Sequence, residues 1–207
     1  MKNSNVVGLL VILLVIMQVF VVVGSWIANA LSPESGVVSM LSSEGVRWFV
    51  GSYARILATP LLIYIILIGV TIGVMRTSRI ADAIRRTAFR PAQRRSDMFF
   101  EHFAIQMATV TFLICIIVIS LLTFLPHAVL LNAHGSIFHS SFSRGFIPMV
   151  CFSLITSSIV YAVLSSRINN LRTLSHALTN GIAIISPLIL LYILAAQLYF
   201  SITYVLP

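Results

Sequence analysis

Charged side chains are scarce in this sequence of 207 residues. Asp, Glu, Lys and Arg make up only 9% of it, and only five residues are acidic, whereas a soluble domain carries about 25% charged residues. Hydrophobic residues make up 59% of the chain and the mean hydropathy is +1.05. This composition excludes an ordinary water-soluble protein, and we expect lipid to surround most of the chain.

The residue patterns of enzymes and metalloproteins are also missing. The two cysteines, Cys115 and Cys151, fall in apolar runs, where they behave as small hydrophobic residues rather than disulfide partners or metal ligands. We find no phosphate-binding glycine loop, no H-E-x-x-H and no G-x-S-x-G sequence. We therefore expect no enzyme activity, no cofactor and no metal. The predicted loop histidines His127, His134 and His139 lack the i, i+4 spacing of helical zinc sites, so we expect them to be solvated.

Five long apolar runs are what the sequence does contain. A bilayer core of about 30 Å is crossed by about 20 apolar residues in a helix. The runs predict an all-α, polytopic membrane protein that forms a single integral membrane domain over residues 1–207, with short loops between the spans. The five predicted transmembrane helices cover residues 6–27, 56–75, 103–125, 146–164 and 181–205.

The first run has a second interpretation. Ala28-Asn29-Ala30 fits the cleavage pattern of a secretory signal peptide. The apolar run before it, however, is longer than the apolar region of such a peptide, which usually has about 7–15 residues. We favour a retained span and leave cleavage open. After it, Ser42-Ser43-Glu44 has the pattern of a helix start, and the apolar residues that follow recur at helical spacing. They predict one amphipathic helix at the membrane interface, with Trp48 as its aromatic anchor.

Basic residues are concentrated in one connector, residues 76–102. By the positive-inside rule this connector is cytoplasmic, which places the N-terminus in the cytoplasm and the C-terminus outside. Binding of anionic lipid headgroups is a second role that we leave open, whereas nucleic acid is not expected because no aromatic residues alternate with the basic ones. The predicted topology determinants are Arg76, Arg79, Arg85, Arg86, Arg90, Arg94 and Arg95.

Two sets of residues within the spans are candidates for contacts with other helices. Gly69 and Gly73 form a G-x-x-x-G pair, which allows a neighbouring helix to approach closely. Ser153, Ser157 and Tyr161 recur at every fourth position and give the fourth span a polar face. We favour interhelical hydrogen bonds for this face and keep a substrate- or water-lined surface as the alternative. No charged residue lies at the centre of a span, which argues against a self-contained ion pump.

Several segments, in the same order, resemble the p-aminobenzoyl-glutamate transporter (AbgT) family. The first block comprises Met40–Trp48, with the sequence M-L-S-S-E-G-V-R-W, and Leu67–Val74. The second comprises Ser140–Pro148, residues 159–161 and Pro187–Leu198. Members of the family are dimeric transporters of the bacterial inner membrane and are about twice as long. The resemblance therefore implies a related helical scaffold.

The chain departs from the family where its transporters insert re-entrant hairpins. The Arg-rich connector stands in the place of the first hairpin, and the sequence ends soon after Ala195-Ala196-Gln197, before the second. We therefore carry over no site residue. The resemblance implies a short AbgT-like form, linked to transport of p-aminobenzoyl-glutamate or related folate precursors or drugs and working as an oligomer. The alternative is a non-transporting scaffold or accessory subunit that binds partner helices.

Overall fold

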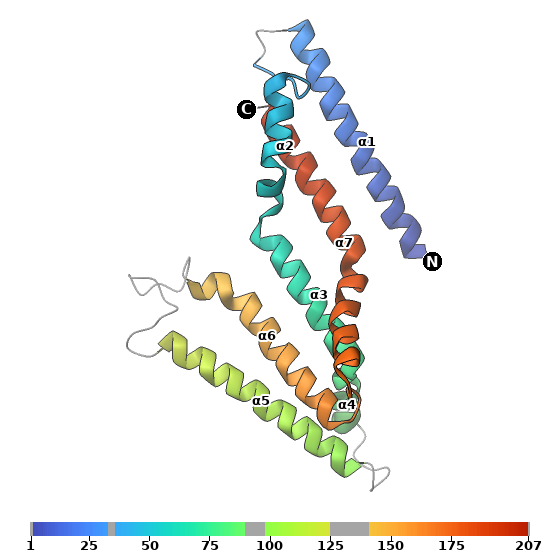
Figure 1. Ribbon diagram of the computed structural model, residues 1–207, viewed down its shortest axis with the longest axis vertical. Helices are drawn as coiled ribbons and strands as arrows, with labels where there is room; N and C mark the ends of the chain where they lie inside the picture. The colour runs from blue at the N-terminus through green and yellow to red at the C-terminus, as the bar shows by residue number, and fades with distance from the viewer. Residues whose placement is uncertain (1, 33–35, 90–97, 125–140, 207) are drawn as a thin grey trace. The chain divides into compact units, whose positions relative to one another are not determined.

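The computed structural model describes residues 2–32, 36–89, 98–124 and 141–206, and regular structure in these ranges is entirely helical (Figure 1). This confirms the all-α fold. Among the described residues, five helices are long and apolar enough to cross a membrane, as predicted. The helices are α1 (Lys2–Leu31), α2 (Ser43–Leu57), α3 (Pro60–Ser78), α4 (Ile80–Phe89), α5 (Met98–Phe124), α6 (Ser141–Leu164) and α7 (Leu171–Val205).

Helices α1, α5 and α6 begin at Lys2, Met98 and Ser141, a few residues before the predicted spans, and two other helix starts differ for an identifiable physical reason. The second span begins at Pro60 rather than at residue 56, because proline disfavours the helical conformation in the residue before it and is well suited to the first helical position. The last span was expected from residue 181, but α7 begins at Leu171. Its added turns bury Ala177 against Ala162 and Ile168, and this packing extends the helix beyond the apolar run.

The predicted connectors are also more helical than we expected. After α3, Arg79 adopts a left-handed backbone conformation with φ of 53°, and the chain then enters α4. Ile80 and Ala83 of α4 are buried in a cluster with residues of α5 and α6, while Arg85 and Arg86 are exposed. The amphipathic sequence of this segment therefore forms a helix on the protein surface rather than an extended polar loop.

The chain divides into two compact units, and α3 and α7 each run from one into the other. The first unit contains Met1–Ile65 and Ile185–Pro207, that is α1, α2, the start of α3 and the C-terminal part of α7. Trp48 of α2 stacks on Tyr204 of α7, with ring centroids 4.2 Å apart. The hydroxyl groups of Thr59 and Tyr192 share a hydrogen bond. These contacts hold α2 and its junction with α3 alongside α7.

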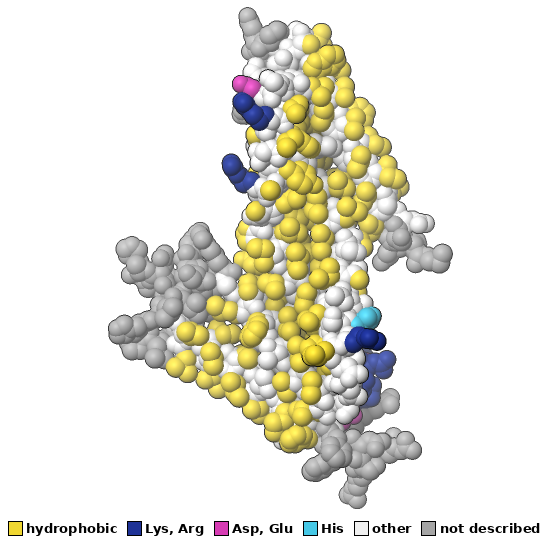
Figure 2. Space-filling view, in the orientation of Figure 1, with side chains coloured by type: hydrophobic (Ala, Val, Ile, Leu, Met, Phe, Trp, Pro, Cys, Tyr) yellow, Lys and Arg dark blue, Asp and Glu magenta, His cyan; other side chains and the backbone are white. Residues whose placement is uncertain are grey.

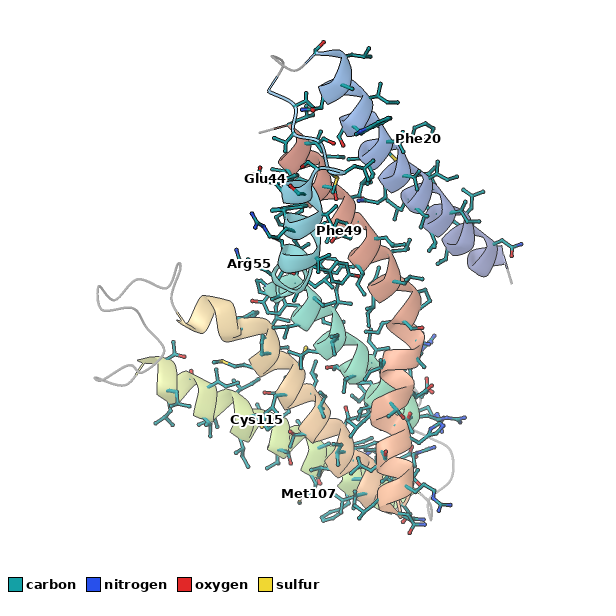
Figure 3. The ribbon with its side chains drawn as sticks, turned by 45° about the horizontal axis from the view of Figure 1, so that its top comes forward. Phe20, Glu44, Phe49, Arg55, Met107 and Cys115 are labelled. Carbon is teal, nitrogen blue, oxygen red and sulfur yellow. The ribbon has the colours of Figure 1, made fainter. Side chains whose placement is uncertain are left out.

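Helix α2 begins where the sequence predicts a capped start. The Ser42 hydroxyl accepts a hydrogen bond from the Gly45 backbone N–H at 3.0 Å, and Glu44 lies in the first turn. Such a cap satisfies one of the free N–H groups at the start of a helix. Figure 3 shows Glu44 and Arg55 near opposite ends of this helix.

The second unit, Ile66–Ile184, is built on α5 and α6, which pack against each other along their length (Figure 1). They run antiparallel, so the start of α5 lies beside the end of α6. The buried cluster consists of Ile80, Ala83, Ala104, Ala108 and Tyr161. Small residues dominate it, which allows the helices to approach closely.

Candidate functional site

The predicted polar face of α6 points into the contact with α5. Ser157 is buried and donates a hydrogen bond to the Ala108 carbonyl of α5 at 2.8 Å. Tyr161 is fully buried, and its hydroxyl donates to Glu101 Oε1 at 3.4 Å. Ser153 is buried as well, but it bonds to the Met149 carbonyl of its own helix. All three side chains are therefore covered by the chain itself.

The two glycines of the G-x-x-x-G pair lie at the contact between α3 and α7. A Cβ atom on Gly73 would overlap the backbone of Gly181 and lie 2.9 Å from the Ala177 carbonyl oxygen. A Cβ atom on Gly181 would overlap the Gly69 carbonyl and lie 2.8 Å from the Val70 Cα. This part of the contact is formed by backbone against backbone, which only glycine permits.

The topology arginines that the structure describes are Arg76, Arg79, Arg85 and Arg86, and all four are exposed. They lie in the last turn of α3, at the turn that follows it and in α4. Arg90, Arg94 and Arg95 fall outside the described residues. Within the second unit, these arginines and the exposed Arg172 at the start of α7 belong to the same end, because α3 and α7 are antiparallel where their glycines meet.

A cluster of amide and hydroxyl groups lies between α1 and α7 in the first unit. Gln18 Nε2 donates to the Ser201 hydroxyl at 2.9 Å, and Ser201 is fully buried. Gln197 lies one turn before Ser201 and is 6% exposed. Gln18 Oε1 and both amide atoms of Gln197 are buried and have no hydrogen-bond partner among the described residues. We call Gln18, Gln197 and Ser201 the amide cluster.

The unsatisfied amide is costly in this setting. A buried polar group without a partner costs roughly 1–3 kcal/mol by mutational measurement, and a membrane interior offers little water to replace the missing bonds. Gln18 makes a hydrogen bond between helices, to Ser201. Gln197 does not, so its free donor and acceptor make the amide cluster a candidate binding site.

A polar pocket of about 280 Å³ opens at the junction of α4, α5 and α6 in the second unit. Arg86 comes from α4, Glu101 from the first turn of α5 and Tyr161 from the last turn of α6. We call it the arginine pocket. Its lining residues are Arg86, Glu101, Tyr161, Leu164, Ser165, Ser166 and Arg167.

The end of α6 positions one side of this pocket. The Arg167 N–H donates to the Ala162 carbonyl at 2.9 Å and the Ser166 N–H to the Val163 carbonyl at 3.0 Å, which is the pattern of a Schellman motif. Ser166 has φ of 54°, the left-handed conformation that usually selects glycine at this position. The motif folds the chain back over the end of α6 and brings Arg167 to the pocket.

Sequence reasoning did not find the arginine pocket or Gly181. The pocket combines residues from three helices, and only the antiparallel alignment of α5 and α6 brings Glu101 to Tyr161. The available signal was a pair of residues: a charged one at the start of one span and a tyrosine at the end of the next.

Within the described ranges, no three His, Cys, Asp or Glu side chains gather as they would around a metal ion. His127, His134 and His139 lie outside those ranges.

Apolar side chains cover the outer surfaces of the helices, as Figure 2 shows for the visible side of α5. Ile114, Ile117 and Val118 of α5 are each at least half exposed. Exposed apolar surface of this extent is unfavourable in water but suits a lipid environment. Together with the five long helices, it defines the chain as an integral membrane protein that crosses the bilayer several times.

Comparison with known proteins identifies the family. Residues 92–204, more than half of the chain, match the model of the AbgT transporter family, and the chain belongs to this family. The match includes α5, α6 and all of α7 except Val205, and therefore Gln197, Ser201 and every lining residue of the arginine pocket except Arg86. No curated protein and no solved structure shows a significant match. Membership relates the chain to membrane transporters.

Proposed function

We propose that this protein transports p-aminobenzoyl-glutamate, or related folate precursors or drugs, across the bacterial inner membrane. One observation carries the proposal beyond family membership: the Gln197 carboxamide is buried in a membrane-spanning helix without a partner among the described residues. A carboxamide offers a donor and an acceptor. The amide bond of p-aminobenzoyl-glutamate presents the complementary pair.

The burial of Gln197 supports a functional role rather than a structural one. An apolar residue at this position would avoid the cost of an unpaired amide, so the glutamine does not stabilise the helix contact. Polar groups inside membrane proteins commonly mark substrate pathways for this reason. Ser201, one turn further along α7, extends the polar surface towards Gln18 of α1.

We propose that the N-terminus is cytoplasmic and the C-terminus outside. Arg76, Arg79, Arg85, Arg86 and Arg172 support this orientation, because they belong to the same end of the second unit and positive charge is retained on the cytoplasmic side. Labelling of single cysteines placed at Arg85 of α4 and at Arg172 in the first turn of α7 tests it. Labelling from outside intact cells would contradict this orientation.

We also propose that the protein works as an oligomer. Phe20 is 72% exposed and projects from α1 on the side away from α7 (Figure 3), so α1 presents an uncovered apolar side to lipid or to a second copy. Native mass spectrometry in mild detergent measures the stoichiometry. A dimer is expected, and a monomer at every protein concentration would contradict this part of the proposal.

The test of transport compares two glutamine-to-leucine variants in cells that take up labelled p-aminobenzoyl-glutamate. Gln197→Leu should reduce uptake at least about tenfold, equivalent to 1.4 kcal/mol, while raising thermal stability because an unpaired amide is removed. Gln106→Leu is the matched control, since Gln106 is exposed on α5. Unchanged uptake in Gln197→Leu cells would contradict the site assignment, and a loss of stability in this variant would indicate a structural role.

A further inference from the structure

We infer that the arginine pocket binds the phosphate group of an anionic phospholipid. The inference concerns the second unit and is independent of the transport proposal, which rests on the amide cluster. Four properties of the pocket support it: its charge, its level along the helices, the apolar surface beside it and the way its arginines are held.

The charge of the pocket fits a phosphodiester. Arg86 and Arg167 contribute two positive charges and Glu101 one negative charge. The pocket therefore has a net charge of +1. Guanidinium groups bind phosphate oxygens through paired N–H donors, and the Ser165 and Ser166 hydroxyls line the same pocket. A phosphodiester carries one negative charge, which neutralises the net positive charge of the pocket. A dicarboxylate carries two, so one of its carboxylates would lie beside Glu101 without a compensating positive charge.

The level of the pocket along the helices corresponds to that of lipid headgroups. Glu101 is the first residue of the apolar span of α5, and Leu164 is the last residue of that of α6. Both residues line the pocket. The pocket therefore lies where the hydrocarbon core gives way to the polar region of the bilayer, which is where phosphate groups are found.

Apolar side chains are exposed at the pocket and within a few residues of it on both helices. Phe103 of α5 is 44% exposed, and Val163 and Leu164 at the end of α6 are 52% and 39% exposed. A free anion such as inorganic phosphate gains nothing from contact with apolar side chains. The acyl chains of a phospholipid whose phosphate is bound in the pocket would lie against them. The exposed Leu164 lines the pocket itself and favours a lipid over inorganic phosphate as the ligand.

Both arginines are held by local structure on either side of the pocket. Ile80 and Ala83 anchor α4 in the buried cluster with α5 and α6, so Arg86 is presented from a fixed helix. Arg167 follows directly after the left-handed Ser166 of the Schellman motif. With the backbone of both arginines in place, only their side chains have to be ordered when a ligand binds, which lowers the entropy cost.

The experiment measures binding of phosphatidylglycerol to the purified full-length protein in mild detergent by native mass spectrometry. Arg86→Gln and Arg167→Gln should each weaken binding about fivefold, and the double variant about 25-fold if the two effects add. Arg55→Gln/Arg172→Gln is the matched control, because it removes the same charge from exposed residues that do not line the pocket. It should bind the lipid as the unmodified protein does.

Three further arms separate the possible ligands. Phosphatidylcholine should bind at least about fivefold more weakly than phosphatidylglycerol, and neither inorganic phosphate nor p-aminobenzoyl-glutamate at millimolar concentration should displace the bound lipid. Equal binding of the two lipids, or equal loss in the double variant and its control, would overturn the inference. Displacement by either soluble anion would overturn it in favour of a soluble-anion site. Circular dichroism of each variant confirms that it is folded.

Discussion

Gly73 of α3 and Gly181 of α7 face each other with no side chain between their backbones. A Cβ on either residue would overlap the opposite helix, so the contact depends on the absence of side chains at both positions. Close backbone approach of this kind increases van der Waals contact between helices in lipid, where burial of apolar side chains provides little driving force. The contact joins α3 to α7 inside the second unit.

Substitution at this contact should destabilise the protein. We expect Gly73→Ala to lower the free energy of unfolding by about 1–3 kcal/mol, because the added methyl group forces the helices apart. Thermal unfolding in detergent, followed by circular dichroism, measures the change. Gly24→Ala is the control: this glycine of α1 has open space around its Cα, so the substitution should be neutral or stabilising by up to about 1 kcal/mol. Equal effects of the two substitutions would contradict the packing described here.

The hydrogen bond between α6 and α5 provides a second prediction. Ser157→Ala removes the donor to the Ala108 carbonyl and should cost about 0.6 kcal/mol, the average for such bonds between membrane helices, and at most about 1.7 kcal/mol. Ser153→Ala is the control, because its equally buried hydroxyl bonds only within α6. The same unfolding assay compares them. A larger loss for Ser153→Ala would show that the bond to α5 does not stabilise the helix pair.

The end of α6 provides a prediction of the opposite sign. Ser166 has a left-handed backbone conformation, which costs roughly 1–2 kcal/mol for residues other than glycine. Ser166→Gly should therefore stabilise the protein, by up to about 1 kcal/mol once the greater freedom of glycine in the unfolded chain is subtracted. Ser166→Val should destabilise it, since a β-branched residue is poorly suited to this conformation. Destabilisation by glycine would contradict the Schellman geometry.

The sequence was sufficient to predict the five spans, because each is a long, mainly apolar run without a charged residue at its centre and lipid imposes a minimum length on a helix that crosses it. It also predicted the start of α2, since Ser42 and Glu44 form a local capping pattern. The extension of α7 to Leu171 was missed. It depends on contacts of Ala177 with residues distant in the sequence, and periodicity in a polar segment does not reveal them.

The candidate sites were less predictable than the spans for the same physical reason. Gln197 is one polar residue in an apolar span, and only its surroundings show that its amide lacks a partner among the described residues. The arginine pocket depends on the pairing of Glu101 with Tyr161 across two helices. Gly181 is a single glycine in the sequence, and its role becomes visible only when Gly73 is placed against it.

The central claim is that this member of the AbgT family transports p-aminobenzoyl-glutamate. The most direct measurement is uptake of the labelled compound into liposomes that contain only the purified protein, with and without an imposed ion gradient. We predict saturable uptake that depends on the gradient and exceeds that of protein-free liposomes. No uptake by protein whose circular dichroism spectrum shows a folded helical structure would contradict the claim and favour an accessory role beside another membrane protein.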